Sequence, residues 1–126
     1  MLNEKLLLNS KKDKYYSLWL TLDYGTYKDA SDDTIYIYSG TEMAWDDNVI
    51  GYITADEYTS SDLFTKEILI PKTGYYWIVG TTKAGIESKK IMSGAVTDYH
   101  TAGHNCRFYF DTSLNEGYLT VTIWND

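Results

Sequence analysis

Cysteine, proline and arginine are each nearly absent from this sequence of 126 residues, which holds one Cys, one Pro and a single Arg, Arg107. The lone cysteine, Cys106, excludes an intrachain disulfide, so an oxidising compartment is not implied. Acidic residues outnumber basic ones. The resulting formal net charge of −7 makes nucleic acid a poor partner and argues against docking on anionic lipid.

Long apolar runs are missing as well. The N-terminal stretch MLNEKLLLNSKKDK has an apolar run of only three residues, Leu6–Leu8, whereas a secretory signal needs about 7–15 apolar residues after a basic start. No segment approaches the ~20 apolar residues of a membrane span, so no membrane insertion is expected. We predict a protein made and kept in the cytoplasm, or released from it by lysis. A domain excised from a secreted precursor would be extracellular instead.

What the sequence has in excess is aromatic residues, 13 Tyr and 4 Trp, together with a two-residue periodicity. In YYSLWLTLDY (15–24), Leu18, Leu20 and Leu22 alternate with polar or amphipathic residues, which is the pattern of a half-buried β-strand. The same alternation occurs in TIYIY (34–38), CRFYF (106–110) and YLTVTIW (118–124). Further strands are predicted at 5–9, 49–53, 64–70, 75–81 and 86–92.

Turn signals separate these runs, for example PKTG, KAG and TSLNEG. About 8–9 short strands at this spacing predict an all-β fold, a single antiparallel β-sandwich that is jelly-roll-like or immunoglobulin-like. Without a linker or repeat, residues 1–126 are expected to form one domain. The last two strands predict a hairpin, with Gly117 taking a positive φ in its loop. One helical turn is predicted near residues 59–63, capped by Ser60, Ser61 or Asp62.

The motif HTAGHNC places His100, His104 and Cys106 close together, which are ligand types that zinc prefers. The motif is predicted to lie in a loop that enters a strand, where these residues do not share a face. Cys106 also alternates with Phe108 and Phe110 on an apolar side, so it is expected to be a core thiol. We therefore predict no zinc site and no Cys–His nucleophile here.

Two acidic loops, KDASDD and WDDN, offer Asp29, Asp32 and Asp33, and Asp46, Asp47 and Asn48. Such oxygen ligands are compatible with a structural calcium ion. The other interpretation is that these residues build turns through side-chain hydrogen bonds to the backbone. The same carboxylates supply no convincing acid–base pair, since a chain with 18 acidic residues brings such pairs together by chance.

The aromatic residues are the main candidates for binding. If the aliphatic side of each strand faces the core, the aromatic residues on the other side point outward. These residues are Trp19, Tyr36, Tyr38, Tyr109 and Trp124. Outward Tyr and Trp rings can form a protein interface, can stack on sugars, or can simply pair across strands. All three interpretations remain open at this point.

Trp45, Asp46 and Asp47 are predicted to lie in a turn between two strands. The aliphatic positions already supply a core, so Trp45 is expected either to cover one end of the sandwich, beside Met43, or to contact a partner from a loop tip. Asp46 and Asp47 would then shape the turn and hydrogen-bond that partner.

Two stretches resemble known families. FYFDTSLNEGYLTVTI (108–123) resembles the last two strands of bacterial starch-binding and related carbohydrate-binding modules. ILIPKTGYYWIVG (68–80) is similar to the strand–turn–strand of β-sandwich modules on tailed-phage fibres and virions. Both resemblances imply a β-sandwich and a non-catalytic role. Neither carries over a functional residue by a matching motif.

These observations favour a non-catalytic structural or interaction protein, foremost a phage virion protein such as a capsid decoration, head or tail accessory protein. It would act through contacts with other protein subunits, copies of itself included, and pass from the host cytoplasm into the virion. The alternative is a carbohydrate-binding module that recognises a polysaccharide such as starch through exposed Trp and Tyr. No enzymatic activity and no cofactor are expected.

Overall fold

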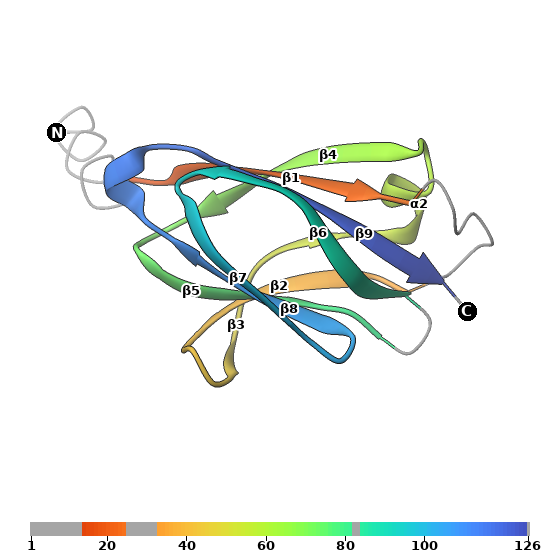
Figure 1. The fold of residues 1–126 in the computed structure, drawn as a ribbon, viewed down its shortest axis with the longest axis horizontal. Coiled ribbons are helices and arrows are strands. Elements are labelled where there is room, and N and C mark those ends of the chain that lie inside the picture. The colour runs from red at the N-terminus through yellow and green to blue at the C-terminus, as the bar shows by residue number, and fades with distance from the viewer. Residues whose placement is uncertain (1–13, 25–32, 82–83, 126) are drawn as a thin grey trace, which may run out of the picture.

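The apolar alternation of the strands builds two β-sheets that pack face to face in the computed structural model, which describes residues 14–24, 33–81 and 84–125 (Figure 1). The first sheet has the strand order β4-β1-β9-β6, with the strands β1 (Tyr16–Asp23), β4 (Leu63–Ile70), β6 (Ala84–Gly94) and β9 (Gly117–Asn125). The second sheet has the order β3-β2-β5-β8-β7, with the strands β2 (Ile35–Gly40), β3 (Trp45–Ile53), β5 (Gly74–Val79), β7 (Val96–Ala102) and β8 (Asn105–Phe110).

The predicted β-sandwich is therefore confirmed, and neighbouring strands are antiparallel except for one pair. β1 and β9 run parallel in the middle of the first sheet, with Trp19 beside Tyr118 and Thr21 beside Thr120. A parallel neighbour places residues of equal orientation side by side on the same face of the sheet. This pairing brings together outward side chains from two ends of the chain.

The core lies between the sheets and consists of the side chains that the alternation predicts to point inward. The fully buried residues include Leu18, Leu20, Leu22, Ile35, Ile37, Phe108, Phe110, Val121 and Ile123, each with no exposed surface. Cys106 is buried among them, as predicted. Because the core is filled from alternate positions, the intervening side chains of the central strands lie on the outer faces of the sheets, where some, such as Trp77, are covered by neighbouring side chains.

The predicted hairpin between 106–110 and 118–124 is wrong, because β8 and β9 belong to different sheets. A short 3₁₀ helix, η1 (Thr112–Leu114), and Asn115 with a φ of 67° carry the chain from one sheet to the other. β9 then inserts between β1 and β6, where both of its edges are hydrogen-bonded. Gly117 is the first residue of β9, and it is not among the described residues that have a positive φ, so the predicted positive φ is also wrong.

Two local predictions also need correction. The helical turn is α2 (Ala55–Tyr58), which begins earlier than predicted because Thr54 and Glu57 form a reciprocal capping box. The strand predictions also leave out Val96–Ala102, which forms β7. The predicted strand at 5–9 lies outside the described residues.

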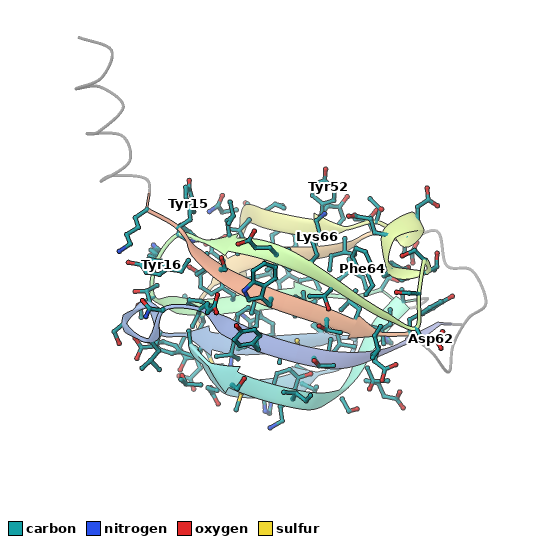
Figure 2. The ribbon with its side chains drawn as sticks, turned by 90° about the horizontal axis from the view of Figure 1, so that it is seen from above. Tyr15, Tyr16, Tyr52, Asp62, Phe64 and Lys66 are labelled. Atoms are coloured by element: carbon teal, nitrogen blue, oxygen red, sulfur yellow. The ribbon has the colours of Figure 1, made fainter. Side chains whose placement is uncertain are left out.

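The edge strands β3 and β4 come together along one side of the sandwich, where Lys66 of β4 links the sheets (Figure 2). Lys66 Nζ donates to the carbonyl oxygen of Tyr52 in β3 at 2.8 Å and lies 4.9 Å from the centre of the Tyr52 ring. It also pairs with Glu57 of α2 at 3.0 Å. The ring of Tyr52 is thereby held at the rim of the second sheet.

Candidate interaction surfaces

The outer face of the second sheet carries a continuous row of aromatic rings, which we call the aromatic ridge. Tyr36 and Tyr38 alternate with the buried Ile35 and Ile37 of β2, so their rings point outward. Register places Tyr52 of β3 beside Tyr36, and Trp77 of β5 beside Tyr38. The ridge consists of Tyr52, Tyr36, Tyr38, Trp45 and Trp77.

Adjacent rings of the ridge are in contact. The ring centres lie 6.3 Å apart for Tyr52–Tyr36, 6.2 Å for Tyr36–Tyr38, 6.3 Å for Tyr38–Trp45 and 5.6 Å for Trp45–Trp77. The interplanar angles run from 30° to 58°, so neighbouring rings are tilted and the surface is uneven. Tyr36 and Trp45 are each 40% exposed and Tyr52 is 50% exposed, while Trp77 is only 5% exposed beneath them.

Trp45 reaches Trp77 because the β2–β3 turn (41–44), which extends away from the first sheet in Figure 1, is anchored to the second sheet by two donors. The indole Nε1 of Trp77 donates to the carbonyl oxygen of Thr41 at 2.8 Å, and Nη1 of Arg107 donates to that of Glu42 at 2.8 Å. At Gly40 a Cβ atom would lie 2.4 Å from the Ala44 carbonyl oxygen, so only glycine fits.

Trp45 therefore opens strand β3 and covers the Trp77 indole on the outside of the second sheet. The predicted loop tip is wrong, because Trp45, Asp46 and Asp47 are the first residues of β3. Trp45 also does not cover an end of the sandwich. Its partial exposure and its firm base together make it a candidate contact residue.

Asp46 shapes the chain at the irregular start of β3. Its carboxylate oxygens accept hydrogen bonds from Ser39 Oγ at 2.9 Å, and Oδ1 accepts one from the Asn48 backbone N–H at 2.7 Å. The bond from the Asn48 N–H is the side-chain to backbone hydrogen bond that the turn-building interpretation expects. Asp47 is exposed.

Tyr109 belongs to a second aromatic pair on the same face. Its ring packs edge-on against Tyr75 with 4.9 Å between the ring centres. Arg107 lies beside Trp77 in the register and 5.3 Å from the centre of the Tyr75 ring, and its Nη2 pairs with Asp98 at 3.3 Å. The single arginine thus bridges this pair to the aromatic ridge.

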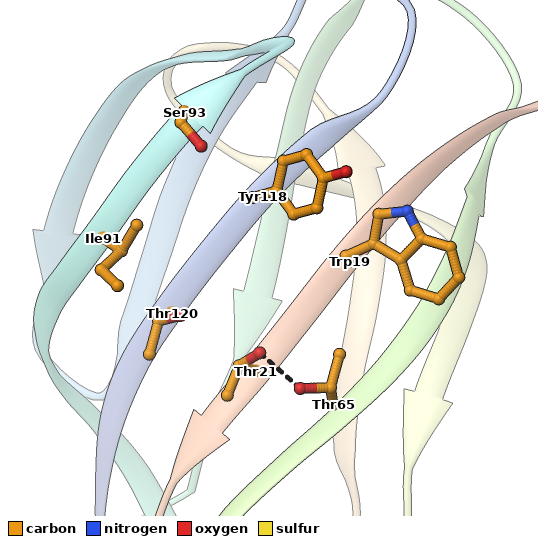
Figure 3. A pocket seen from close by; sticks show the side chains of 7 residues that line it. All are labelled: Trp19, Thr21, Thr65, Ile91, Ser93, Tyr118 and Thr120. Atoms are coloured by element: carbon orange, nitrogen blue, oxygen red, sulfur yellow. Dashed lines mark hydrogen bonds between the residues drawn. The ribbon is translucent and has the colours of Figure 1, made fainter.

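Trp19 lies on the opposite side of the molecule, on the outer face of the first sheet. Around it is a shallow groove of about 440 Å³, the hydroxyl groove, lined by Trp19, Thr21, Thr65, Ile91, Ser93, Tyr118 and Thr120 (Figure 3). Trp19 and Tyr118 form one row across β1 and β9, and the next row consists of Thr65, Thr21 and Thr120. Short threonine side chains therefore lie directly beside two large rings.

Glu116, the residue before β9, holds both rings of the groove. Its Oε2 accepts a hydrogen bond from Trp19 Nε1 at 3.1 Å, and its Oε1 accepts one from the Tyr118 hydroxyl at 2.6 Å. The bond from Tyr118, and to a smaller extent the bond from Trp19, hold the pKa of the Glu116 carboxyl below its ordinary value. The bond between Glu116 and Tyr118 also raises the pKa of the Tyr118 hydroxyl. The carboxylate is therefore ionised at neutral pH and fixes the two polar ends of the rings.

The HTAGHNC motif does not converge. Cys106 points into the core, and burial raises the pKa of its thiol to about 12. His100 is exposed on β7, and His104 is exposed in the turn before β8. Within residues 14–24, 33–81 and 84–125, no group of three His, Cys, Asp or Glu side chains could hold a metal ion. Asp29 and Asp32 of the other acidic loop lie outside the described residues.

The predicted binding residues thus fall on two opposite faces. Tyr36, Tyr38, Trp45 and Tyr109 share the second sheet, whereas Trp19 lies on the first. Trp124 is paired with Gly85 in β9, and its side chain lies outside what the structure describes.

The sequence predictions left out several residues of these two faces, and only some of them have a recognisable pattern in the sequence. Alternation in YYWIVGT could have identified Tyr75 and Trp77, and alternation in VIGYI could have identified Tyr52. Glu116 gave no such signal, because its role depends on the parallel β1–β9 pairing.

Comparison of the chain with protein-family models, with curated proteins and with solved structures found no match in any of the three. In the part of the chain that the structure describes, no helix has the length and apolar character needed to cross a membrane. The two faces are therefore interpreted from their own geometry and chemistry.

Proposed function

We propose that this chain is a non-catalytic interaction protein that binds a protein partner through the aromatic ridge. The observation that carries the proposal is a row of contacting rings, three of them 40–50% exposed, on an anchored base. Tyr and Trp are enriched in protein interfaces because each offers a large contact area at a small cost in conformational entropy.

The uneven relief of the ridge favours a protein partner over a flat sugar chain. The neighbouring outer rings are tilted against each other by 30–45°, so they do not form one flat platform. The ridge also runs to Tyr52 at the edge strand β3, so a partner can extend from the face onto the rim of the sheet. Trp77 and Arg107 hold the β2–β3 turn in place, so little ordering is required on binding.

We further propose that the setting is a multi-subunit assembly, such as the head or tail of a phage, in which the partner is a neighbouring subunit or another copy of this chain. The acidic composition and the strand–turn–strand at 68–80 support this setting. Genes for capsid, portal or tail proteins next to the gene of this chain would agree with it. A gene neighbourhood of glycoside hydrolases would contradict it.

The direct test measures binding of the purified chain to itself and to the products of the adjacent genes, by light scattering after size exclusion and by calorimetry. Tyr36→Ala and Tyr52→Ala remove exposed rings without uncovering Trp77, and each is expected to weaken binding about tenfold or more. Trp19→Ala, on the opposite face, is the matched control and should bind normally. The proposal fails if none of these proteins binds, or if the Tyr36 and Tyr52 variants bind like the unchanged chain.

A further inference from the structure

The hydroxyl groove lies on the face opposite the aromatic ridge, so its chemistry is independent of the proposed protein contact. Its volume of about 440 Å³ lies in the range of small-molecule sites, ~300–1,000 Å³. It is a groove across the sheet rather than a closed cavity, so a chain longer than the groove can pass through it. A site of this shape suits one unit of a polymer.

Two aromatic rings form one side of the groove. In Figure 3 the strands of the first sheet are seen face on, and the rings of Trp19 and Tyr118 are also seen broadly face on. Their flat surfaces therefore turn away from the sheet toward solvent, and Tyr118 is 43% exposed. A ring face exposed in this way attracts C–H groups that carry partial positive charge.

Threonine side chains form part of the floor of the groove, next to the exposed apolar side chain of Ile91. Thr21, Thr65 and Thr120 lie in one row across three strands, and Ser93 lies on β6 beside Tyr118. Thr21 Oγ1 and Thr65 Oγ1 are 2.6 Å apart, so one of them donates to the other and retains lone pairs toward solvent. The donor of this pair can only accept from a ligand, whereas the other hydroxyls can donate and accept, which matches a ligand that is itself rich in hydroxyls.

The seven side chains that line the groove carry no charge. Among the charged side chains near the groove, Glu116 bonds the polar ends of both rings, and Glu67 is paired with Trp19 across β4 and β1 and accepts a hydrogen bond from Ser17. Lys89 is exposed on β6, two residues before Ile91. Because no lining side chain is charged, the groove offers no ion-pair partner to an anionic or a cationic ligand. The occupant that fits is therefore neutral, with an apolar C–H face and several hydroxyl groups.

We propose that the hydroxyl groove binds a pyranose unit of a neutral polysaccharide, with the sugar ring stacked on Trp19 and Tyr118 and its hydroxyls directed to the threonine row. Glu116 is a positioning residue, since it holds both rings through their polar atoms. This site would give the chain a second, glycan-binding activity beside its protein contact.

The test uses affinity electrophoresis and calorimetry of the full chain with soluble starch, mixed-linkage β-glucan, galactomannan and xylan, with alginate as the acidic control. At least one neutral polysaccharide is expected to bind and alginate is not. Trp19→Ala and Tyr118→Ala are each expected to weaken that binding about tenfold. Tyr36→Ala, which removes an exposed ring of the other face, should bind the polysaccharide normally.

Glu116→Gln retains one oxygen acceptor and is expected to lose less affinity than Glu116→Ala, while the melting temperatures of both stay close to that of the unchanged chain because the side chain is exposed. The proposal is overturned if none of the four neutral polysaccharides binds, or if binding survives in both ring variants. It is also overturned if Trp19→Ala abolishes self-association instead, because the groove would then be a protein interface. The polysaccharide measurements do not depend on whether the aromatic ridge binds a protein.

Discussion

Replacing Arg107 by Met is expected to loosen the β2–β3 turn and with it the aromatic ridge. Methionine replaces the apolar part of the arginine side chain but is shorter, and it lacks the guanidinium group, whose Nη1 donates to the carbonyl oxygen of Glu42 at 2.8 Å. The same group pairs with Asp98 at 3.3 Å and lies 5.3 Å from the centre of the Tyr75 ring. Its side chain is only 15% exposed, so water substitutes poorly for these contacts.

The magnitude follows from these contacts. A charged hydrogen bond to a carbonyl contributes about 1.5–3 kcal/mol. The pair with Asp98 contributes ~0.2–1 kcal/mol, because that carboxylate is 48% exposed, and the contact with Tyr75 adds ~0.5–1 kcal/mol. Against this, Arg107 Nε is buried without a hydrogen-bond partner in the described structure, which costs ~1–3 kcal/mol. We therefore expect Arg107→Met to lower the free energy of unfolding by about 2 kcal/mol.

Urea unfolding monitored by tryptophan fluorescence measures this change, and calorimetry should show a melting temperature lower by roughly 5–10 °C. Arg107→Lys should lose nearly as much, because an ammonium group cannot reach Glu42, Asp98 and Tyr75 in the planar geometry of the guanidinium. The double-mutant cycle with Asp98→Asn should give a coupling below about 1 kcal/mol. A loss of less than ~0.5 kcal/mol in Arg107→Met would refute the anchoring role.

Two further predictions concern packing and pH. Gly117→Ala should destabilise the fold by about 1–3 kcal/mol in thermal melting, because the new Cβ would lie 2.9 Å from Val96 Cγ2 and 3.0 Å from the Phe110 ring. Gly103→Ala, where no atom lies within 4 Å but φ is +63°, is the control and should show only the strain of the left-handed region, about 1–2 kcal/mol. The buried Cys106 thiol ionises near pH 9 when unfolded but at about 12 when folded, so it contributes a loss of stability as pH rises between these values. In Cys106→Ala the free energy of unfolding should therefore fall less steeply over that window, and an equal slope in both proteins would show that the thiol does not contribute.

Trp45 illustrates how far sequence reasoning reached at the candidate site. Its partial exposure was among the predicted alternatives, because the aliphatic positions alone fill the core. Its place on Trp77 was not predictable, because it depends on hydrogen bonds from β5 and β8 to a turn 36 and 65 residues away in sequence. The donors are Trp77 and Arg107, neither of which carries a local signal for that contact.

The sequence by itself determined which side chains point inward in the strands with clear alternation, because the pleat of a strand has a period of two and apolar residues are buried. That rule placed Leu18 and Ile37 in the core and turned Trp19 and Tyr36 outward. Only the tertiary structure decided which strands are neighbours, because backbone hydrogen bonds join any two strands with similar strength. The tertiary structure placed β8 and β9 in different sheets and paired β1 with β9 in parallel. As a result, Trp19 and Tyr36 lie on opposite faces of the sandwich.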